Sequence, residues 1–123
     1  MQDAVGEPWP NFLDYDPLTK SLRVEFDGGG VFDLPAEYLR VESPSAEVQG
    51  HSPSERKIVP GRRHVGIIDI EPVGNYAVCL IFDDLHDTGI YSWRYLHELG
   101  REYTVRWQRY LAALEVRGLS RDP

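Results

Sequence analysis

The sequence contains one cysteine, Cys79, among its 123 residues. A single cysteine cannot form a disulfide within the chain, and it cannot build a multi-cysteine zinc or iron–sulfur site. The sequence also lacks an uninterrupted apolar run of the roughly 18 residues that a membrane helix needs. Its first residues lack the basic and apolar regions of a secretory signal. We therefore expect a soluble, cytoplasmic protein that does not contact membranes.

Positive charge is also scarce, and the formal net charge is −7. Nucleic-acid binding needs a concentrated basic face, and the acidic stretches at residues 1–50 and 67–99 argue against nucleic acid as a partner. Bases outnumber acids only in residues 51–66 and 100–123. The first of these segments holds four bases and one acid, which is a pattern typical of a solvated loop.

The length and the hydrophobic content of 41% suffice for one domain with one core. We expect this domain over residues 18–117, with tails at 1–17 and 118–123. Apolar runs predict five strands, at residues 22–26, 31–34, 67–71, 76–82 and 88–91. Turn-forming residues join the first two strands and the next two. The run 76–82 is apolar at nearly every position, which predicts a central strand covered on both faces.

Between these hairpins the pattern becomes irregular. Pro35 can open a short helix over residues 36–40. From residue 43 to residue 64, prolines, glycines and serines interrupt any period. A connection of this length is either functional or a mobile insertion, and the sequence does not separate the two.

The last quarter of the chain is helical. Ser92 is placed to cap a helix over residues 93–99, which Gly100 would end. Apolar and aromatic side chains then recur at helical spacing over residues 103–114, and the arginines fall mostly off that stripe. The sequence therefore predicts an α+β fold. It is a compact single domain of mainly antiparallel β-strands, with short helices and a C-terminal amphipathic helix.

Four histidines, His51, His64, His86 and His97, are the natural candidates for chemistry. None stands in a His-x-Asp or His-x-Glu pair, so the usual facial-triad spacing of an iron oxygenase is missing. A zinc site from the first three and an aspartate is conceivable, although no spacing selects it. The aspartates around His86 can tune it as a general base, but we favour a polar loop that caps backbone amides. We identify no catalytic and no cofactor-binding residue.

Several segments are shared with a known family. They are LRVEF, LPAEYLRVESPSAEVQGH, VGIIDIEPVGNYAVCLIFDDLHDTGIYSW and YLHELG. Through them the chain resembles the gamma-butyrobetaine hydroxylase-like N-terminal domain over about residues 18–105. The resemblance implies a compact α+β domain that occurs alone in bacteria. The same domain precedes the oxygenase domain of carnitine-biosynthesis hydroxylases, and in plants it is appended to a P-loop iron–sulfur carrier ATPase.

In the hydroxylases this domain holds a structural zinc through a Cys-x-Cys-x-x-Cys cluster and a later histidine. By position, these ligands fall on Ser43, Ser45, Val48 and His86. Serine and valine cannot replace thiolate ligands, so we expect the family zinc to be lost and no cofactor to be bound. The chain also ends about where the oxygenase domain would begin, so we do not expect it to hydroxylate gamma-butyrobetaine.

We therefore expect a non-enzymatic accessory or interaction module with a protein partner, either an iron–sulfur carrier ATPase or an oxygenase. The link to iron–sulfur protein maturation rests on domain fusion alone. The candidate partner-binding residues are His51, Arg62, Arg63, His64, His86 and Asp87. Exchange of Arg62 and Arg63 for glutamate should then abolish partner binding and leave the melting temperature nearly unchanged. The alternatives are a small metal- or ligand-binding protein that uses His51, His64 and His86, and an assembly subunit of an oxygenase.

Overall fold

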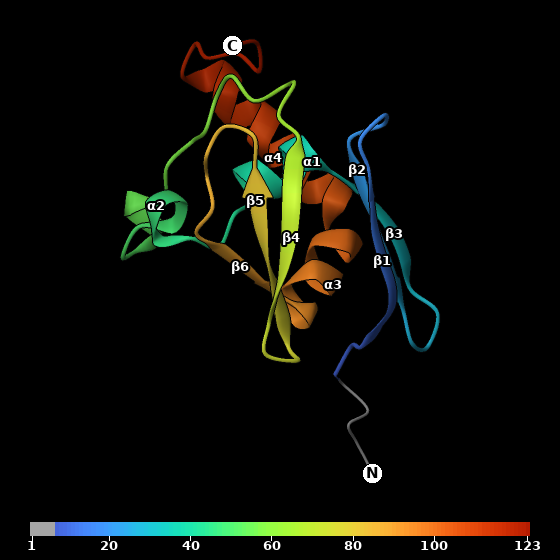
Figure 1. The fold of residues 1–123 in the computed structure, drawn as a ribbon. Coiled ribbons are helices and arrows are strands. Elements are labelled where there is room, and N and C mark those ends of the chain that lie inside the picture. The colour runs from blue at the N-terminus through green and yellow to red at the C-terminus, as the bar shows by residue number, and fades with distance from the viewer. Residues whose placement is uncertain (1–6) are drawn as a thin grey trace.

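The computed structural model describes residues 7–123, which form two antiparallel sheets and a set of helices (Figure 1). The first sheet has the order β1-β2-β3, at Pro10–Asp16, Ser21–Phe26 and Val31–Pro35. The second has the order β4-β5-β6, at Ile67–Val73, Ala77–Phe82 and Gly89–Ser92. The helices are α1 (Ala36–Val41), α2 (Ala46–Gln49), α3 (Trp93–Arg101) and α4 (Tyr103–Val116), and a 3₁₀ turn, η1, lies at Pro53–Glu55. The α+β fold class predicted from the sequence is confirmed.

One core lies between the two sheets and the helices. Figure 1 shows α3 and α4 behind β4 and β5, with the first sheet along one side. The core takes Leu22 and Val24 from the first sheet, Leu80 and Phe82 from the second, and Leu96 from α3. Burial of each such side chain contributes about 1.5–3 kcal/mol. None of the described helices is long and apolar enough to cross a membrane.

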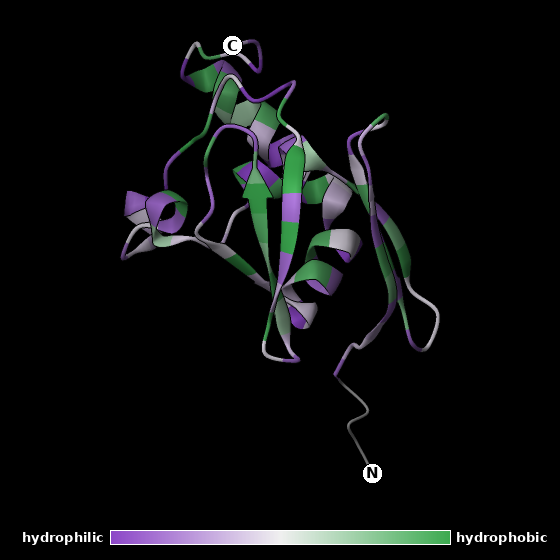
Figure 2. Cartoon of the chain, viewed as in Figure 1, coloured by the Kyte–Doolittle hydropathy of each residue, from purple (hydrophilic) through white to green (hydrophobic). Residues whose placement is uncertain are grey.

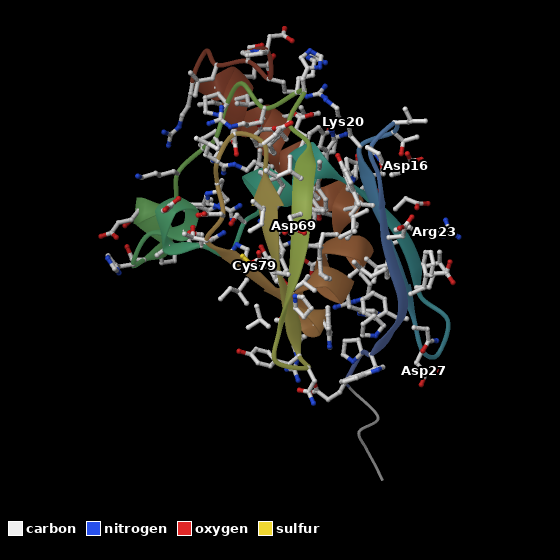
Figure 3. All side chains as sticks on the ribbon, in the orientation of Figure 1. Asp16, Lys20, Arg23, Asp27, Asp69 and Cys79 are labelled. Atoms are coloured by element: carbon white, nitrogen blue, oxygen red, sulfur yellow. The ribbon has the colours of Figure 1, made fainter. Side chains whose placement is uncertain are left out.

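Strand β2 shows the two-residue alternation that its sequence predicts. Leu22 and Val24 are fully buried, whereas Arg23 points away from the helices (Figure 3). On that outer face Arg23 pairs with Glu25 and Asp33. These pairs are exposed, and surface pairs of this kind contribute at most about 1 kcal/mol.

Strand β5 lies at the centre of the second sheet, as predicted, between β4 and β6. Figure 2 shows hydrophobic colouring along β5, whereas β4 alternates between hydrophobic and hydrophilic bands and α2 is hydrophilic. One face of β5 is buried through Val78, Leu80 and Phe82. Cys79 and Ile81 are only half-buried. The prediction that both faces are covered is therefore only partly correct.

Residues 10–16, which we expected in an N-terminal tail, form the edge strand β1. Leu13 pairs with Val24 and Tyr15 with Leu22 in an antiparallel register. The Tyr15 hydroxyl accepts a hydrogen bond from the Ile67 amide at 3.1 Å, which joins the edges of the two sheets. This strand was not predicted from the sequence because prolines flank it. Proline is confined to strand ends and edges, so the pattern indicated an irregular tail. Residues 1–6 of the expected tail lie outside the described residues.

The expected C-terminal tail is likewise bound to the domain. The Gly61 amide donates to the Ser120 carbonyl, and the Arg63 amide donates to the Arg121 carbonyl, both at 3.0 Å. The Arg121 guanidinium also donates twice to the Glu37 carboxylate of α1, at 2.8 and 2.7 Å. Two-point contacts of this kind are among the stronger charged hydrogen bonds.

The start of α3 was predicted correctly, and its end was not. The Ser92 hydroxyl accepts from the Tyr95 amide at 3.0 Å and caps the helix. Gly100 does not end the helix, because α3 continues to Arg101 and α4 follows within two residues. The glycine is instead required for packing, since a Cβ at this position would overlap the Phe32 ring of β3.

Gly100→Ala should therefore lower the free energy of unfolding by about 1–3 kcal/mol, the usual cost of overpacking. The intrinsic preference of a helix interior runs the other way and favours alanine by about 0.5–1 kcal/mol. Urea unfolding measures the difference. In a Phe32→Ala background the same exchange should become neutral or stabilising, and an unchanged penalty would rule out this contact as the cause.

Candidate functional site

All six residues of α1 are buried, and two of them, Glu37 and Arg40, are charged. Glu42, directly after the helix, is only 4% exposed. Burial of a charge costs several kcal/mol unless an opposite charge and hydrogen bonds compensate it. Each of these charges has a partner from a distant segment. The pairs are Glu37–Arg121, Arg40–Asp84, Glu42–Arg106 and Glu42–Arg56. Helix α1 thus fixes the C-terminal residues, the β5–β6 loop, α4 and the segment after η1.

Arg106 of α4 is the most heavily engaged of these partners. It donates to Glu42 at 2.7 Å, to Glu102 at 2.9 Å and to Glu98 at 2.5 Å, and it lies over the Tyr95 ring. Burial alone would lower the pKa of Arg106, but the hydrogen bonds to Glu42 and Glu102 raise it above its ordinary value. Our expectation that the arginines of this helix lie off its buried side is wrong for Arg106.

Asp84, in the loop between β5 and β6, binds two arginines. Its Oδ2 accepts from Arg40 Nε at 2.8 Å and from Arg62 Nε at 2.7 Å. Its Oδ1 accepts from the His86 amide at 3.1 Å. Burial raises the pKa of Asp84, but the guanidinium groups and this amide outweigh it and hold the pKa below its ordinary value. Arg40 Nη1 is buried without a hydrogen-bond partner among the described residues, so Arg40 depends strongly on this carboxylate.

Next to this loop, His86 joins Ser43 and Glu47. His86 Nε2 lies 2.8 Å from Ser43 Oγ, and Nδ1 lies 3.1 Å from Glu47 Oε1. An ionised carboxylate only accepts hydrogen bonds, so Glu47 places the proton on Nδ1 and Nε2 accepts from the hydroxyl. This is the order of groups in a serine–histidine–acid hydrolase. Ser43 is 0% exposed, however, so its hydroxyl cannot reach a substrate.

Three of the four positions to which the resemblance assigns zinc ligands lie together in the structure. The Ser45 amide donates to Ser43 Oγ at 3.2 Å, and the Ser45 hydroxyl hydrogen-bonds Thr88 Oγ1 at 2.7 Å. The fourth position, Val48, is apolar and buried. A single imidazole with two hydroxyls does not fit zinc. Across residues 7–123 no three His, Cys, Asp or Glu side chains are grouped so that they could hold a metal ion.

Two of the predicted partner-binding residues have internal roles. Arg62 is bound to Asp84 and also donates to the Pro60 carbonyl at 3.0 Å. His86 is 5% exposed. Exchange of Arg62 for glutamate should therefore lower the melting temperature, in contrast to the expectation from the sequence, because it removes a partner of Asp84.

The other predicted residues are exposed but scattered. Arg63 pairs with Asp122 at 2.5 Å. The His64 carbonyl accepts from a lysine of the β1–β2 turn, and the Asp87 carbonyl accepts from Cys79 Sγ. His51 lies after α2, where its amide donates to Glu55. The structure does not bring His51, His64 and His86 into one metal-binding group among the described residues.

A feature that the sequence did not reveal lies between residues 56–59 and α4. It is a cavity of about 160 Å³, lined by Val41, Glu42, Arg56, Lys57, Ile58, Val59, Arg109, Tyr110 and Ala113. A wider cleft of about 510 Å³ adjoins it, lined by Gln49, Gly50, His51, Ser52, Pro53, Arg56 and Arg109. We call the two together the basic groove, since Glu42 is the only acid in either lining and it already binds two arginines.

The walls of the basic groove are held in place by the domain. The Tyr110 hydroxyl donates to the Val59 carbonyl at 2.7 Å, and burial raises the pKa of Tyr110 to about 12. The Lys57 amide donates to the Val48 carbonyl at 2.8 Å. Lys57 and Arg109 are exposed, and neither forms an ion pair within the described part of the chain. Of the residues predicted to bind a partner, only His51 borders this groove.

Comparison with known proteins gives a match of residues 14–97 to the family described as gamma-butyrobetaine hydroxylase-like, N-terminal. Two NMR solution structures share 43% and 44% identity with the chain, each with a TM-score of 0.83. They cover 100% and 96% of this chain, and 92% and 93% of their own.

A crystal structure of a protein of unknown function from Acidithiobacillus ferrooxidans, which belongs to the DUF971 family, is also similar. It shares 36% identity with a TM-score of 0.63, over 74% of this chain and 91% of that one. No curated protein matches the chain.

The Asp84 interactions predict a large effect of a small change. Asp84→Asn keeps the shape of the side chain but leaves Arg40 buried without a counter-charge, and the loss of one partner of a buried pair costs about 3 kcal/mol. Urea unfolding measures this cost. Asp83→Asn is the matched control, because it removes the same charge at an exposed position. Equal unfolding midpoints for the two variants would refute the role of Asp84.

His86 should make stability depend on pH. Burial and Arg40 lower its pKa below 6.5 more than Glu47 raises it. Below about pH 6.5 the unfolded chain therefore binds a proton that the folded chain does not, so the contribution of neutral His86 is present above that pH and is lost as the pH falls. His86→Gln should flatten the fall in unfolding free energy between about pH 7 and pH 5. His51→Gln, at an exposed position, should retain that fall, and two identical pH profiles would contradict the assignment.

Proposed function

This chain belongs to the gamma-butyrobetaine hydroxylase-like N-terminal family, and we propose that it acts as a non-enzymatic module that docks onto a partner protein through the basic groove. The observation that carries the proposal is a contrast among the cations. Arg40, Arg106 and Arg121 are bound to internal carboxylates. Lys57 and Arg109, in contrast, are exposed beside an apolar cavity and have no ion pair within residues 7–123.

The burial of the serine–histidine–acid cluster supports a binding role. The nearest approach to a catalytic set is the hydrogen-bonded chain from Ser43 through His86 to Glu47, and its hydroxyl is fully buried. A nucleophile must reach the atom that it attacks. We therefore assign this cluster to the stability of the domain and the basic groove to its function.

The charge of the groove indicates the kind of partner. The chain carries a net charge of −7, and a basic groove on an acidic body selects an acidic partner surface and orients it on approach. The first partner to test is an iron–sulfur carrier ATPase, because the resembling plant domain is fused to one. Domain fusion is the only argument for this choice of partner.

Co-purification from the native host at low salt tests the proposal. Lys57→Glu with Arg109→Glu reverses two charges of the groove, and Arg101→Glu with Arg117→Glu reverses two exposed charges elsewhere. Both double variants change the net charge equally. The groove variant should reduce enrichment of the partner at least about tenfold, which corresponds to about 1.4 kcal/mol, while the control retains it.

Melting temperatures must first show that both double variants are folded. Enrichment that survives in the groove variant, or that falls equally in both, would contradict docking through this groove. Enrichment of nothing above background by the unaltered chain would contradict the proposed function itself.

A further inference from the structure

We infer that the occupant of the basic groove is an extended acidic peptide segment of the partner, with one apolar side chain inserted into the cavity between residues 56–59 and α4. The inference rests on the proposed function and specifies what the groove recognises. Three properties of the groove support it: the size of its deep part, the sign of its charges, and the rigidity of its walls.

The deep part of the groove has the size of one side chain. Its volume is about 160 Å³, close to the roughly 150 Å³ of an engineered apolar cavity in another protein that binds benzene. Small-molecule sites usually span about 300–1,000 Å³. Val41, Ile58 and Ala113 give the cavity an apolar lining. A leucine or phenylalanine side chain fits these dimensions.

The charges around this cavity favour carboxylates on both sides of the inserted side chain. Lys57 lies at the deep cavity, and Arg56 and Arg109 line both the cavity and the wider cleft. The one acidic lining residue, Glu42, accepts from Arg106 at 2.7 Å and pairs with Arg56 at 3.1 Å. Because Arg106 and Arg56 pair with Glu42, the lining charges left without an ion pair among residues 7–123 are Lys57 and Arg109, and both are positive.

The walls of the groove are formed before the ligand arrives. On one side, two contacts hold residues 50–59 in place. They are the ion pair between Arg56 and Glu42 and the hydrogen bond from the Lys57 amide to the Val48 carbonyl. On the other side, Tyr110 of α4 holds the Val59 carbonyl. A preformed site avoids the entropic cost of ordering the groove, which would weaken binding. A short peptide can therefore bind without a rearrangement of the domain.

Fluorescence anisotropy with labelled peptides tests the inference on the full chain. The probes are acetylated EELEE and EEFEE, with EEGEE as the control without an apolar side chain and KKLKK as the control for charge. Saturable binding is expected for the first two, with at least about tenfold weaker binding of EEGEE and none of KKLKK. Affinity should also fall as salt screens the charges.

Three variants of the chain separate shape from charge. Ala113→Leu fills the cavity and should weaken EELEE at least about tenfold while leaving EEGEE unchanged. Arg109→Glu should weaken both peptides, and Arg117→Glu, on the same helix but outside the groove, should weaken neither. Far-ultraviolet circular dichroism and melting temperatures confirm that each variant is folded.

Several results would overturn the inference. They are no saturable binding of EELEE or EEFEE up to about 1 mM, equal binding of EEGEE, or an equal effect of Arg117→Glu. Hexanoate that binds as tightly as EELEE would indicate a small carboxylate ligand instead. If co-purification depends on the groove but neither peptide binds, the docking function stands and this inference fails. If the peptides bind but the groove variant still enriches the partner, the proposed function fails and this inference stands.

Discussion

Burial of Glu37, Arg40 and Glu42 beside the core costs free energy that only paired, hydrogen-bonded opposite charges can offset. This requirement explains why segments far apart in the sequence converge on α1. Glu37 holds the C-terminal residues, Arg40 holds the loop of Asp84, and Glu42 holds both α4 and the segment after η1. Arg121 and Arg40 each depend on one carboxylate, whereas Arg106 has further carboxylate partners in Glu98 and Glu102.

The same pairs engage the arginines around α1, whereas several other cations form no ion pair within residues 7–123. Arg62 completes the environment of Asp84 and is not free for a partner in the way its loop position suggests. Lys57 and Arg109 are left exposed at a cavity whose wall Glu42 fixes in place. The charge pairs around α1 therefore hold in place a wall of the basic groove, the only surface for which we propose a function.

Ser43, Ser45 and His86 form a buried hydrogen-bonded cluster. The Ser43 hydroxyl hydrogen-bonds the His86 imidazole and accepts from the Ser45 amide. Gly89 permits this approach, because a Cβ there would lie 2.6 Å from Ser43 Oγ. The cluster stabilises the chain at a buried site without offering a reactive group to solvent.

Much of the fold followed from local patterns, and the errors have particular physical causes. The alternation in β2 and the apolar run of β5 predicted both strands, and Ser92 predicted the start of α3. Gly100 was misread as a helix end because its role is to admit the Phe32 ring, a contact between distant residues. The resemblance placed Ser43 and His86 in one cluster, but it did not point to Glu47, which also contacts His86. The basic groove could not be predicted, because residues 56–59 and α4 meet only through pairs that span many residues.

Glu42 holds residues 50–59 in place and so preforms the basic groove. Hydrogen–deuterium exchange of Glu42→Gln, compared with the unaltered chain, tests it most directly. In the variant Arg106 keeps its bonds to Glu98 and Glu102, so we predict unchanged protection of α3 and the core strands. The amides of residues 50–57, several of which are hydrogen-bonded, should exchange faster. Unchanged protection of those amides in a folded variant would contradict the account.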